Sequence, residues 1–277
     1  MDITSFIQQS LQEDIEQGDY TTLSTINKDQ QGKAKLLVKE NGVLAGIDLA
    51  KLIFQEVDST LNFQQLLNDS DEIKKGDIAF IVEGKTQSIL IAERLVLNCM
   101  QRMSGIATIT SELSLLLKPY GIKILDTRKT TPLNRLIEKW AVRIGGGLNH
   151  RFGLYDMILI KDNHVDSAGG IKNALIKAQQ FLQKNKMTIP IEIETRNYNE
   201  IIEALSTGIP DRIMLDNFDP NAIKEAVKII NGQCEIEISG GITKENILHY
   251  AIKGVDFISM GVLTHSVKSL DLSLKIN

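Results

Sequence analysis

Residues 191–217 read IEIETRNYNEIIEALSTGIPDRIMLDN, and this stretch decides the fold. Two short β-branched runs, IEIET and RIMLD, flank an amphipathic stretch, NEIIEALSTG, which ends in glycine. A strand, a helix and a second strand joined by short polar connections form a parallel βα unit. The stretch therefore predicts neighbouring parallel strands with a helix crossing back over their sheet.

The same alternation continues on both sides of this unit. The predicted strands are GIKILDT, DMILIKD, IPIEIET, DRIMLDN, CEIEISGG and VDFISMG, with amphipathic stretches between most of them. Five or six such units in series suit an α/β barrel better than a sandwich. A doubly wound open sheet remains an alternative, because periodicity along the chain does not show closure.

The first part of the chain has a different pattern. The runs KAKLLVKE, IDLAKLIFQEV and GDIAFIVEG predict a mixed α+β domain with strands joined by turns. A long helix, roughly residues 89–118, leads from it into the barrel-like half. Polar or small residues recur along this helix at spacings of four and three, and so form a stripe on one face: Arg94, Asn98, Gln101, Gly105 and Thr108. The stripe is either a solvated face or part of a site.

Composition excludes several classes of function. The 277 residues are 43% hydrophobic and carry a formal net charge of -4, so no basic face for nucleic acid is indicated. The N-terminus lacks the pattern of a signal peptide, and no apolar run is long enough to span a bilayer. We therefore expect a cytoplasmic protein with neither nucleic-acid nor membrane partners. Cys99 and Cys234 each lie in an apolar stretch and are expected to be buried thiols.

Polar residues follow six successive predicted strands at their carboxyl ends. In parallel α/β folds these ends meet at one edge, where ligands bind. Such regularity favours a functional site over surface decoration. The residues are Asp126, Arg128 and Lys129; Lys161, Asp162, Asn163 and His164; Glu194; Asp216 and Asn217; Ser239, Gly240 and Gly241; and Gly261.

These strand-end residues sort by charge. The segment from Asp126 to His164 holds seven Lys and Arg against four acidic residues, inside a protein of net charge -4. Arg128 and Arg151 offer planar guanidinium groups that suit carboxylates or phosphates, and Lys129 and Lys161 offer point charges. A strongly anionic ligand is expected.

The later strands offer two other kinds of group. Glu194 and Asp216 supply hard oxygen atoms, which suit Mg²⁺ or ribose hydroxyls. Ser239-Gly240-Gly241 is expected to open a helix, KENILHY, whose N-terminus would favour a phosphate, and Gly261 follows the last strand. A phosphorylated sugar coupled to a second, carboxylated reactant would fill such a site.

At these residues the sequence resembles the quinolinate phosphoribosyltransferases. The most specific motifs are DTRKTTP, GGGLNHRFGL and LIKDNH, and the resemblance extends over nearly the whole chain. It implies an α/β fold with an N-terminal α/β sandwich domain and an incomplete, seven-stranded α/β barrel. We expect the sandwich domain over residues 1–108, with residues 266–277 returning to it, and the barrel over residues 109–265.

The resemblance also implies roles for single residues. Arg128, His150 and Arg151 would bind the two quinolinate carboxylates, and Arg94 would join them from the partner subunit of a homodimer; a hexamer is left open. Lys129 and Lys161 would contact quinolinate or the pyrophosphate of phosphoribosyl pyrophosphate, and both count as catalytic together with Glu194 and Asp216. These two acids would meet the ribose hydroxyls and Mg²⁺. The 5′-phosphate would be held by Ser239, Gly240, Gly241 and Gly261.

The implied reaction is phosphoribosyl transfer to quinolinate with loss of CO₂, which gives nicotinate mononucleotide and pyrophosphate in de novo NAD biosynthesis. One departure from the family pattern is visible. Leu133-Asn134 follow TTP where the family has Gly-Leu, which leaves the loop conformation and any role of Arg135 open.

Other readings of these residues are weaker. Lys161 could be a Schiff-base lysine, although neighbouring Asp162 argues against the lowered pKa that such a lysine needs. His164 is better explained as a structural hydrogen-bonding residue than as a catalyst. Two rival functions remain: a molybdenum-associated paralogue with another substrate, and a non-catalytic sensor of phosphoribosyl pyrophosphate or a dicarboxylate.

Overall fold

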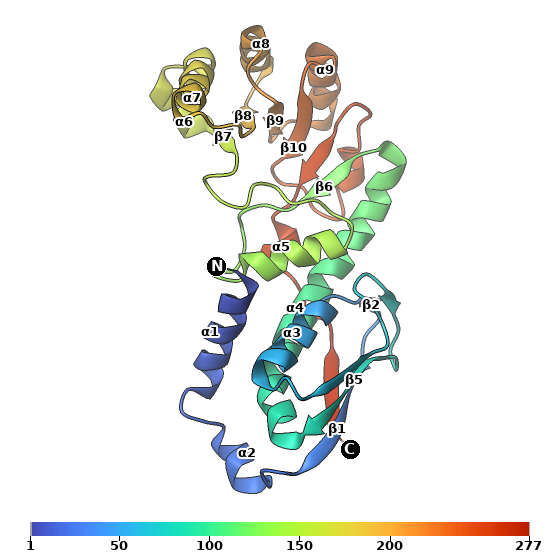
Figure 1. Cartoon of the computed structure of the whole chain (residues 1–277). Coiled ribbons are helices and arrows are strands. Elements are labelled where there is room, and N and C mark those ends of the chain that lie inside the picture. The colour runs from blue at the N-terminus through green and yellow to red at the C-terminus, as the bar shows by residue number, and fades with distance from the viewer. Residues whose placement is uncertain (1, 277) are drawn as a thin grey trace. The chain divides into compact units, whose positions relative to one another are not determined.

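The computed structural model describes residues 2–276, which divide into two compact units (Figure 1). The first unit holds the chain up to Ser111, Thr130–Gly146 and the chain from Leu263 on. The second holds Glu112–Lys129 and Gly147–Val262. In this division residues 130–146 group with the N-terminal part, whereas the sequence placed them in the barrel.

An antiparallel sheet of four strands forms the centre of the first unit, with the order β12-β1-β5-β3. Its edge strand β12 comes from the far end of the chain and pairs with β1. The strands are β1 (Gln31–Val38), β3 (Asn62–Gln65), β5 (Ile78–Lys85) and β12 (Leu272–Ile276), and a separate small sheet contains β2 (Gly42–Val43) and β4 (Glu72–Ile73). The helices before α4 are α1 (Ile3–Ile15), α2 (Tyr20–Thr25) and α3 (Ile47–Val57).

Aromatic side chains fill the core between α3 and this sheet. Phe54 of α3 lies 5.8 Å from Phe80 of β5 and 5.9 Å from Phe63 of β3, measured between ring centroids. Offset and tilted aromatic pairs at such distances pack favourably. The helix-on-sheet arrangement confirms the α/β character expected of the N-terminal domain.

The polar stripe on α4 (Thr86–Leu117) is largely structural. Gln101 donates to the backbone oxygen of Leu272 at 2.9 Å, and the Thr108 hydroxyl accepts from the N–H of Val43 at 2.9 Å. At Gly105 a Cβ atom would lie 2.3 Å from the backbone oxygen of Lys268, so only glycine allows this approach. Arg94 and Asn98 are exposed. The stripe is therefore mostly a packing surface for the C-terminal segment and β2.

Residues 130–146 join the first unit through contacts with α4. The carboxylate of Glu138, on α5 (Arg135–Ile144), is fully buried and accepts from Arg102 at 2.7 Å. At Gly145 a Cβ atom would lie 2.5 Å from the backbone oxygen of Ala107. The helix that follows the first barrel strand thus packs on α4, which the local alternation of strands and helices did not predict.

A parallel sheet of six strands forms the second unit, with the order β6-β11-β10-β9-β8-β7. The strands are β6 (Lys123–Leu125), β7 (Ile158–Ile160), β8 (Ile191–Thr195), β9 (Arg212–Asp216), β10 (Glu235–Ser239) and β11 (Phe257–Ser259). Figure 1 shows α7, α8 and α9 on the outer side of β8, β9 and β10. The incomplete α/β barrel expected from the sequence is confirmed.

The seventh strand of that expectation is reduced to a single bridge. Leu148 pairs in parallel with Leu125 at the β6 edge, and no longer strand forms there among the described residues. Gly146, with φ 84°, precedes the bridge, and a bend over residues 152–157 follows it, so the chain stays extended too briefly for a ladder.

The remaining helices are α6 (Asp162–Ala168), α7 (Ile171–Asn185), α8 (Tyr198–Thr207), α9 (Pro220–Ile230) and α10 (Val262–His265), with 3₁₀ turns at η1 (Lys118–Tyr120) and η2 (Ile247–His249). Among the described residues no helix combines the length and apolar character needed to cross a membrane.

Candidate active site

Charged side chains meet at the carboxyl edge of the parallel sheet. Lys161 follows β7 and Glu194 lies near the end of β8, and Lys161 Nζ is 2.6 Å from Glu194 Oε1. The lysine side chain is 48% exposed and the glutamate only 11%, so the ion pair is open to solvent from one side. Asp216 ends the next strand, β9, where it is half-buried. The sequence predicted these three residues at one edge, and the structure places them there.

His164 shapes the backbone at Lys161. Its Nδ1 atom accepts the N–H of Lys161 at 3.0 Å, and its own N–H donates to the Lys161 carbonyl at 2.8 Å. These reciprocal bonds begin α6 in the manner of a capping box. The structural role predicted for His164 is confirmed.

Residues 149–151 are held against β6 by a buried carboxylate. Asp126 is fully buried; its Oδ1 accepts the N–H of His150 at 2.8 Å, and its Oδ2 accepts from the side chain of Asn149 at 2.6 Å. Asp156 holds the other end of the segment by accepting the N–H of Phe152 at 2.6 Å. Asp126 is thus a support for this loop rather than a group facing a ligand.

Two guanidinium groups come near each other at this edge. Arg151 is half-buried; burial lowers its pKa first, and the charge of Arg128 lowers it further. Arg128 and Lys129 are exposed. Like charges collected beside a half-buried guanidinium attract an anion, because a bound carboxylate relieves their repulsion. The anionic pocket predicted from the local positive charge is consistent with this placement.

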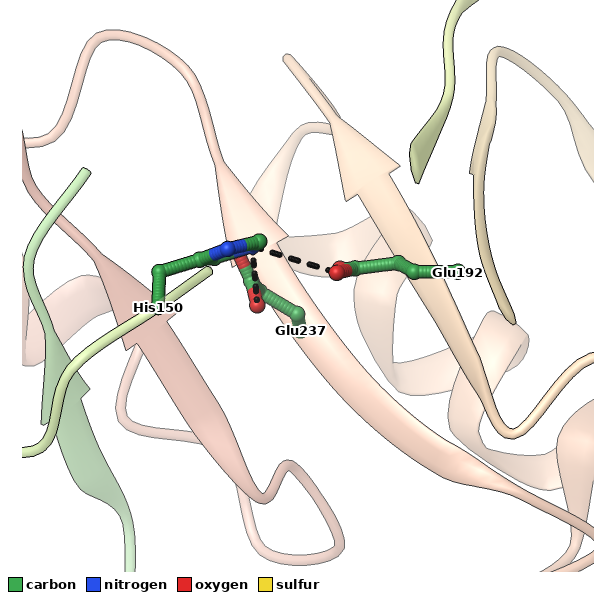
Figure 2. A group of neighbouring side chains, drawn as sticks. All are labelled: His150, Glu192 and Glu237. Atoms are coloured by element: carbon green, nitrogen blue, oxygen red, sulfur yellow. Dashed lines mark ion pairs between the residues drawn. The ribbon is translucent and has the colours of Figure 1, made fainter. Parts of the chain in front are cut away.

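His150 lies below this edge, inside the barrel (Figure 2). Its Nε2 atom is 3.1 Å from Glu192 Oε2 and 3.5 Å from Glu237 Oε2, and both carboxylates are fully buried. Its Nδ1 atom accepts the N–H of Arg151 at 2.7 Å. Because the side chain is only 6% exposed, the geometry favours an indirect role over direct contact with a ligand, although that contact stays a prediction.

The pKa of His150 and the hydrogen bond to its Nδ1 atom favour different protonation states of the ring. Burial lowers the pKa of His150, but hydrogen bonds to Glu192 and Glu237 and their charges raise it to about 9. The bond from the Arg151 N–H requires a bare Nδ1 atom, and a 2.7 Å separation leaves no room for a second proton there. We therefore place one proton on Nε2 of His150. The second proton, which a doubly protonated ring would carry, is placed on the carboxylates.

The carboxylates differ in how readily they hold that proton. Burial, followed by the charge of Glu237, raises the pKa of Glu192 to about 7. Burial would also raise the pKa of Glu237, yet bonds from His150 and Ser259 and the charge of Arg212 hold it below its usual value. Glu192 is therefore the carboxyl group that keeps a proton near neutrality.

The glycine loop after β10 has a conformation open to few residues. Gly240 has φ 97°, and a Cβ atom there would lie 2.2 Å from Asn217 Oδ1. Gly241, with φ 62°, has open space around it. Ser239 pairs with Asp216 in the parallel ladder, so the loop lies beside the end of β9. The predicted glycine turn is present, and Gly261 follows β11 at the adjacent strand end.

The helix predicted after this loop is absent from the described residues of that segment. Residues 244–250 contain only the 3₁₀ turn η2. Asn246 closes a turn instead: its Oδ1 accepts the N–H of Thr243 at 2.8 Å and its Nδ2 donates to the Gly241 carbonyl at 3.0 Å. An anion here would rely on backbone N–H groups of the loop without a helix dipole.

Two sets of side chains could hold a metal ion. Glu194 and Asp216 present carboxylates at adjacent strand ends, a donor set that suits Mg²⁺ carrying substrate phosphates. His150, Glu192 and Glu237 also have ligand atoms within 4.8 Å of one another. In that cluster Nε2 carries a proton, so it has no lone pair for a cation, and only the first set fits.

One predicted site residue lies in the other compact unit, and two residues of the site were not predicted. Arg94 belongs to the first compact unit, whereas all other predicted site residues lie in the second. Glu192 and Glu237 were missed. Their signal was the unbroken alternation of IEIE and EIEI, which places glutamates on the inward face of strands that both neighbours cover.

Comparisons with known proteins agree with this geometry. Residues 19–104 match the family model of the quinolinate phosphoribosyl transferase N-terminal domain, and residues 106–275 match the model of its C-terminal domain. Quinolinate phosphoribosyltransferase [decarboxylating] 1b of Nicotiana tabacum is 47% identical over 100% of this chain and 83% of its own length. The probable nicotinate-nucleotide pyrophosphorylase [carboxylating] of Bacillus subtilis is 44% identical over 95% of this chain and 90% of its own.

Solved structures show the same architecture. The crystal structure of NadC from Streptococcus pyogenes superposes with a TM-score of 0.94 at 38% identity, over 99% of this chain and 96% of that one. The nicotinate-nucleotide pyrophosphorylase from Francisella tularensis superposes with a TM-score of 0.92 at 40% identity and the same coverage.

Proposed function

The chain belongs to the quinolinate phosphoribosyltransferase family, and we propose how its strand-end residues divide the work of that reaction. It is a decarboxylating transferase of NAD biosynthesis, which moves a phosphoribosyl group from phosphoribosyl pyrophosphate to quinolinate. The observation that carries the assignment of residues is the meeting of Lys161, Glu194 and Asp216 with the Arg128–Arg151 pair at one edge of the sheet.

Quinolinate is a planar dicarboxylate, and the paired guanidinium groups suit it. We assign its two carboxylates to Arg128 and Arg151, whose planar N–H groups can each form two parallel hydrogen bonds. His150 would complete this pocket from below, where its ring holds the backbone of Arg151. Arg94 would contribute from the partner subunit of a homodimer.

Phosphoribosyl pyrophosphate would lie across the acidic and glycine-rich strand ends. Ser239, Gly240 and Gly241 would hold its 5′-phosphate through backbone N–H groups, together with Gly261 after the adjacent strand β11. Lys129 and Lys161 would face its pyrophosphate or the quinolinate carboxylates. Glu194 and Asp216 would bind the ribose hydroxyls.

Mg²⁺ is proposed as the cofactor, held by Glu194 and Asp216 directly or through water. When bound, it would neutralise charge on the departing pyrophosphate. Lys161 would do similar work from the protein side, since its ammonium group is already fixed by Glu194 at 2.6 Å. Positioned charge of this kind stabilises developing charge without reorganisation during the reaction.

The bond changes follow from the reactants. The pyridine nitrogen attacks the anomeric carbon while the bond to pyrophosphate breaks, and the carboxylates of Glu194 and Asp216 stabilise the positive charge that builds on the ribose. The quaternised ring then accepts the electron pair of the breaking C–CO₂ bond, and a proton replaces the lost carboxylate. Positioning by fixed side chains carries most of this rate.

The assay that tests this assignment is formation of nicotinate mononucleotide from quinolinate and phosphoribosyl pyrophosphate, with nicotinate as control. Product is expected with quinolinate as the pyridine substrate and not with nicotinate. A folded protein that turns over neither pyridine would overturn the assignment and favour the molybdenum-associated paralogue. An Asp216→Ala variant with normal turnover would contradict the mechanism, whereas ligand binding without turnover in the unmodified protein would favour the sensor.

A shared active site is proposed for the homodimer, and mixing variants would test it. Arg94→Ala and Glu194→Gln should each be inactive alone. If the dimers exchange subunits, a mixed dimer regains one site with neither change, so about one site in four becomes native. If mass measurements show that the subunits exchange but activity does not recover, the active site is not shared between subunits. A cytoplasmic location is likewise proposed, from the composition of the chain.

A further inference from the structure

Two glutamates occupy inward positions of the barrel that are normally apolar. Glu192 on β8 lies on the same face as Glu194, two residues closer to the amino end, and Glu237 on β10 lies likewise below Ser239. Both side chains are fully buried, and Figure 2 shows them pointing at the ring of His150 from two different strands. Neither residue reaches the carboxyl edge where the proposed substrates bind.

These carboxylates are costly for the fold. The Oε1 atoms of Glu192 and Glu237 are buried without a hydrogen-bond partner among the described residues, and Glu192 Oε2 has only the ion pair with His150 Nε2 at 3.1 Å. Burying a carboxylate without donors costs free energy, and well-packed uncharged side chains often stabilise such positions. Stability of the barrel therefore does not explain Glu192, whereas Glu237 also pairs with Arg212 Nη1 at 3.0 Å.

A chain of contacts connects the glutamates to Arg151. Glu192 and Glu237 face His150 Nε2 at 3.1 and 3.5 Å, and His150 Nδ1 accepts the backbone N–H of Arg151 at 2.7 Å. Asp126 fixes the backbone of His150 from the other side. The ring is thus clamped in one orientation, with its acceptor nitrogen bonded to the backbone of Arg151, whose guanidinium group is proposed to bind the anionic ligand.

We propose that Glu192 and Glu237 are positioning residues for quinolinate recognition, acting through His150 on Arg151. The proposal rests on the proposed function, because the role of Arg151 is itself assigned there. The glutamates keep the ring from rotating, and the ring keeps the Arg151 backbone in place for a planar contact with a carboxylate. Loosening this chain affects the dicarboxylate and leaves the phosphate loop after β10 undisturbed.

The test is a steady-state comparison of Glu192→Gln and Glu237→Gln with the unmodified enzyme. Each variant keeps the shape of the side chain and removes its ionisable carboxyl group. We expect KM for quinolinate to rise about tenfold or more, with KM for phosphoribosyl pyrophosphate within about twofold. Tm should be unchanged or higher in Glu192→Gln, and lower in Glu237→Gln, which removes the charge paired with Arg212 at 3.0 Å. Glu235→Gln is the matched control, since Glu235 also pairs with Arg212, at 2.8 Å, but lies at the exposed end of β10.

A double-mutant cycle shows whether the effect passes through Arg151. Combining Glu192→Gln with Arg151→Lys should raise KM for quinolinate less than the product of the two separate effects, because both changes damage one contact. If the rise in KM of the double variant equals the product of the two separate rises, the proposal is overturned. Unchanged KM values would also overturn it, as would equal rises in both KM values with a lower Tm, which mark a purely structural role.

The two glutamine variants are separate tests, so one folded variant suffices. Should neither fold, His150→Gln removes the clamped ring while leaving both glutamates, and it must show the same selective rise in KM. An unmodified protein that fails to convert quinolinate overturns the proposed function, whereas an active one with unaffected variants overturns only this inference.

Discussion

Lys161 and Glu194 form an ion pair of 2.6 Å between neighbouring parallel strands, at the edge where the substrates are proposed to bind. A carboxylate at this distance stabilises the charged ammonium group, whereas a Schiff-base lysine must attack as the neutral amine. The pair therefore favours an electrostatic role for Lys161 in stabilising the leaving pyrophosphate.

Replacing Lys161 by methionine should lower kcat by about 10² to 10³, the usual effect of removing one charge that stabilises a transition state. Tm should change little, since the Lys161 side chain is 48% exposed, and ion pairs open to solvent contribute at most about 1 kcal/mol. Lys224→Met, on the exposed face of α9, is the control. Activity near that of the control would show that Lys161 contacts no reacting group.

Gly240→Ala should weaken the proposed phosphate loop. An added Cβ would meet Asn217 Oδ1 at 2.2 Å and Asn217 N at 2.9 Å, so the loop or Asn217 must move. We expect KM for phosphoribosyl pyrophosphate to rise at least about tenfold, as the loss of a well-placed hydrogen bond to a charged group implies. Gly232→Ala is the control, because Gly232 also has positive φ, 71°, but nothing within 4 Å. Equal KM values in the two variants would contradict a crowded phosphate loop.

Leu133→Gly should stabilise the protein. Leu133 has φ 66°, a left-handed conformation that costs an L-residue roughly 1–2 kcal/mol, and its side chain is 73% exposed, so little burial is lost. After the flexibility that glycine adds to the unfolded chain, a gain of about 0.5–1 kcal/mol remains. Urea unfolding measures it. Leu133→Ala should show no such gain; a gain of equal size there would mean that side-chain exposure, not backbone strain, is the cause.

The positive φ of Leu133 also bears on the departure from the family pattern. Glycine at this position would suit the left-handed backbone, which this chain adopts with a leucine at a cost in strain. Arg135, whose role the sequence left open, begins α5 and donates from Nε to the Thr130 hydroxyl at 3.0 Å. It thus supports the loop that contains Leu133.

How far the sequence predicted the molecule depends on the range of the interactions concerned. The βα units were predictable because the periodicity of each strand and helix is local. The seventh strand was not, because whether Leu148 makes one bridge or a ladder depends on hydrogen bonds to a distant strand. The helix after the glycine loop failed for a local reason: Asn246 bonds to Thr243 and Gly241 and closes a turn there.

The same distinction holds for the site. Lys161, Glu194 and Asp216 were predictable because the carboxyl ends of parallel strands converge. Glu192 and Glu237 were not, since a glutamate alternating with isoleucine in a strand usually faces water. Only the covered sheet shows that these positions face a barrel interior, and only the fold brings His150 between them.

Both thiols should be slow to react in the folded protein. Burial raises the pKa of Cys99 to about 12 and that of Cys234 to about 11, so the reactive thiolate is scarce at pH 8. Reaction with a disulfide reagent should accelerate about tenfold per pH unit above 8 for half-buried Cys234, and both thiols should react quickly in urea. The Cys99→Ala variant isolates Cys234. A rate that levels off near pH 8.5 would show an ordinary thiol pKa.

The tautomer of His150 tests the central contact of the barrel. Nitrogen-15 shifts at pH 7 should show a neutral ring with its proton on Nε2, because Nδ1 accepts the Arg151 N–H at 2.7 Å. The nearby carboxylates pull the other way by raising the pKa of His150 to about 9, which favours two protonated nitrogens. We expect the hydrogen bond to prevail, because a proton on Nδ1 would collide with the Arg151 N–H at 2.7 Å. Burial raises the pKa of Glu192, so this carboxyl group can hold the additional proton instead. In Glu192→Gln the carboxyl group that holds the additional proton is lost, and the His150 ring should stay neutral with its proton on Nε2. A doubly protonated ring at pH 7 would mean that the Arg151 N–H has left Nδ1, and the chain from the glutamates to the guanidinium group would be broken.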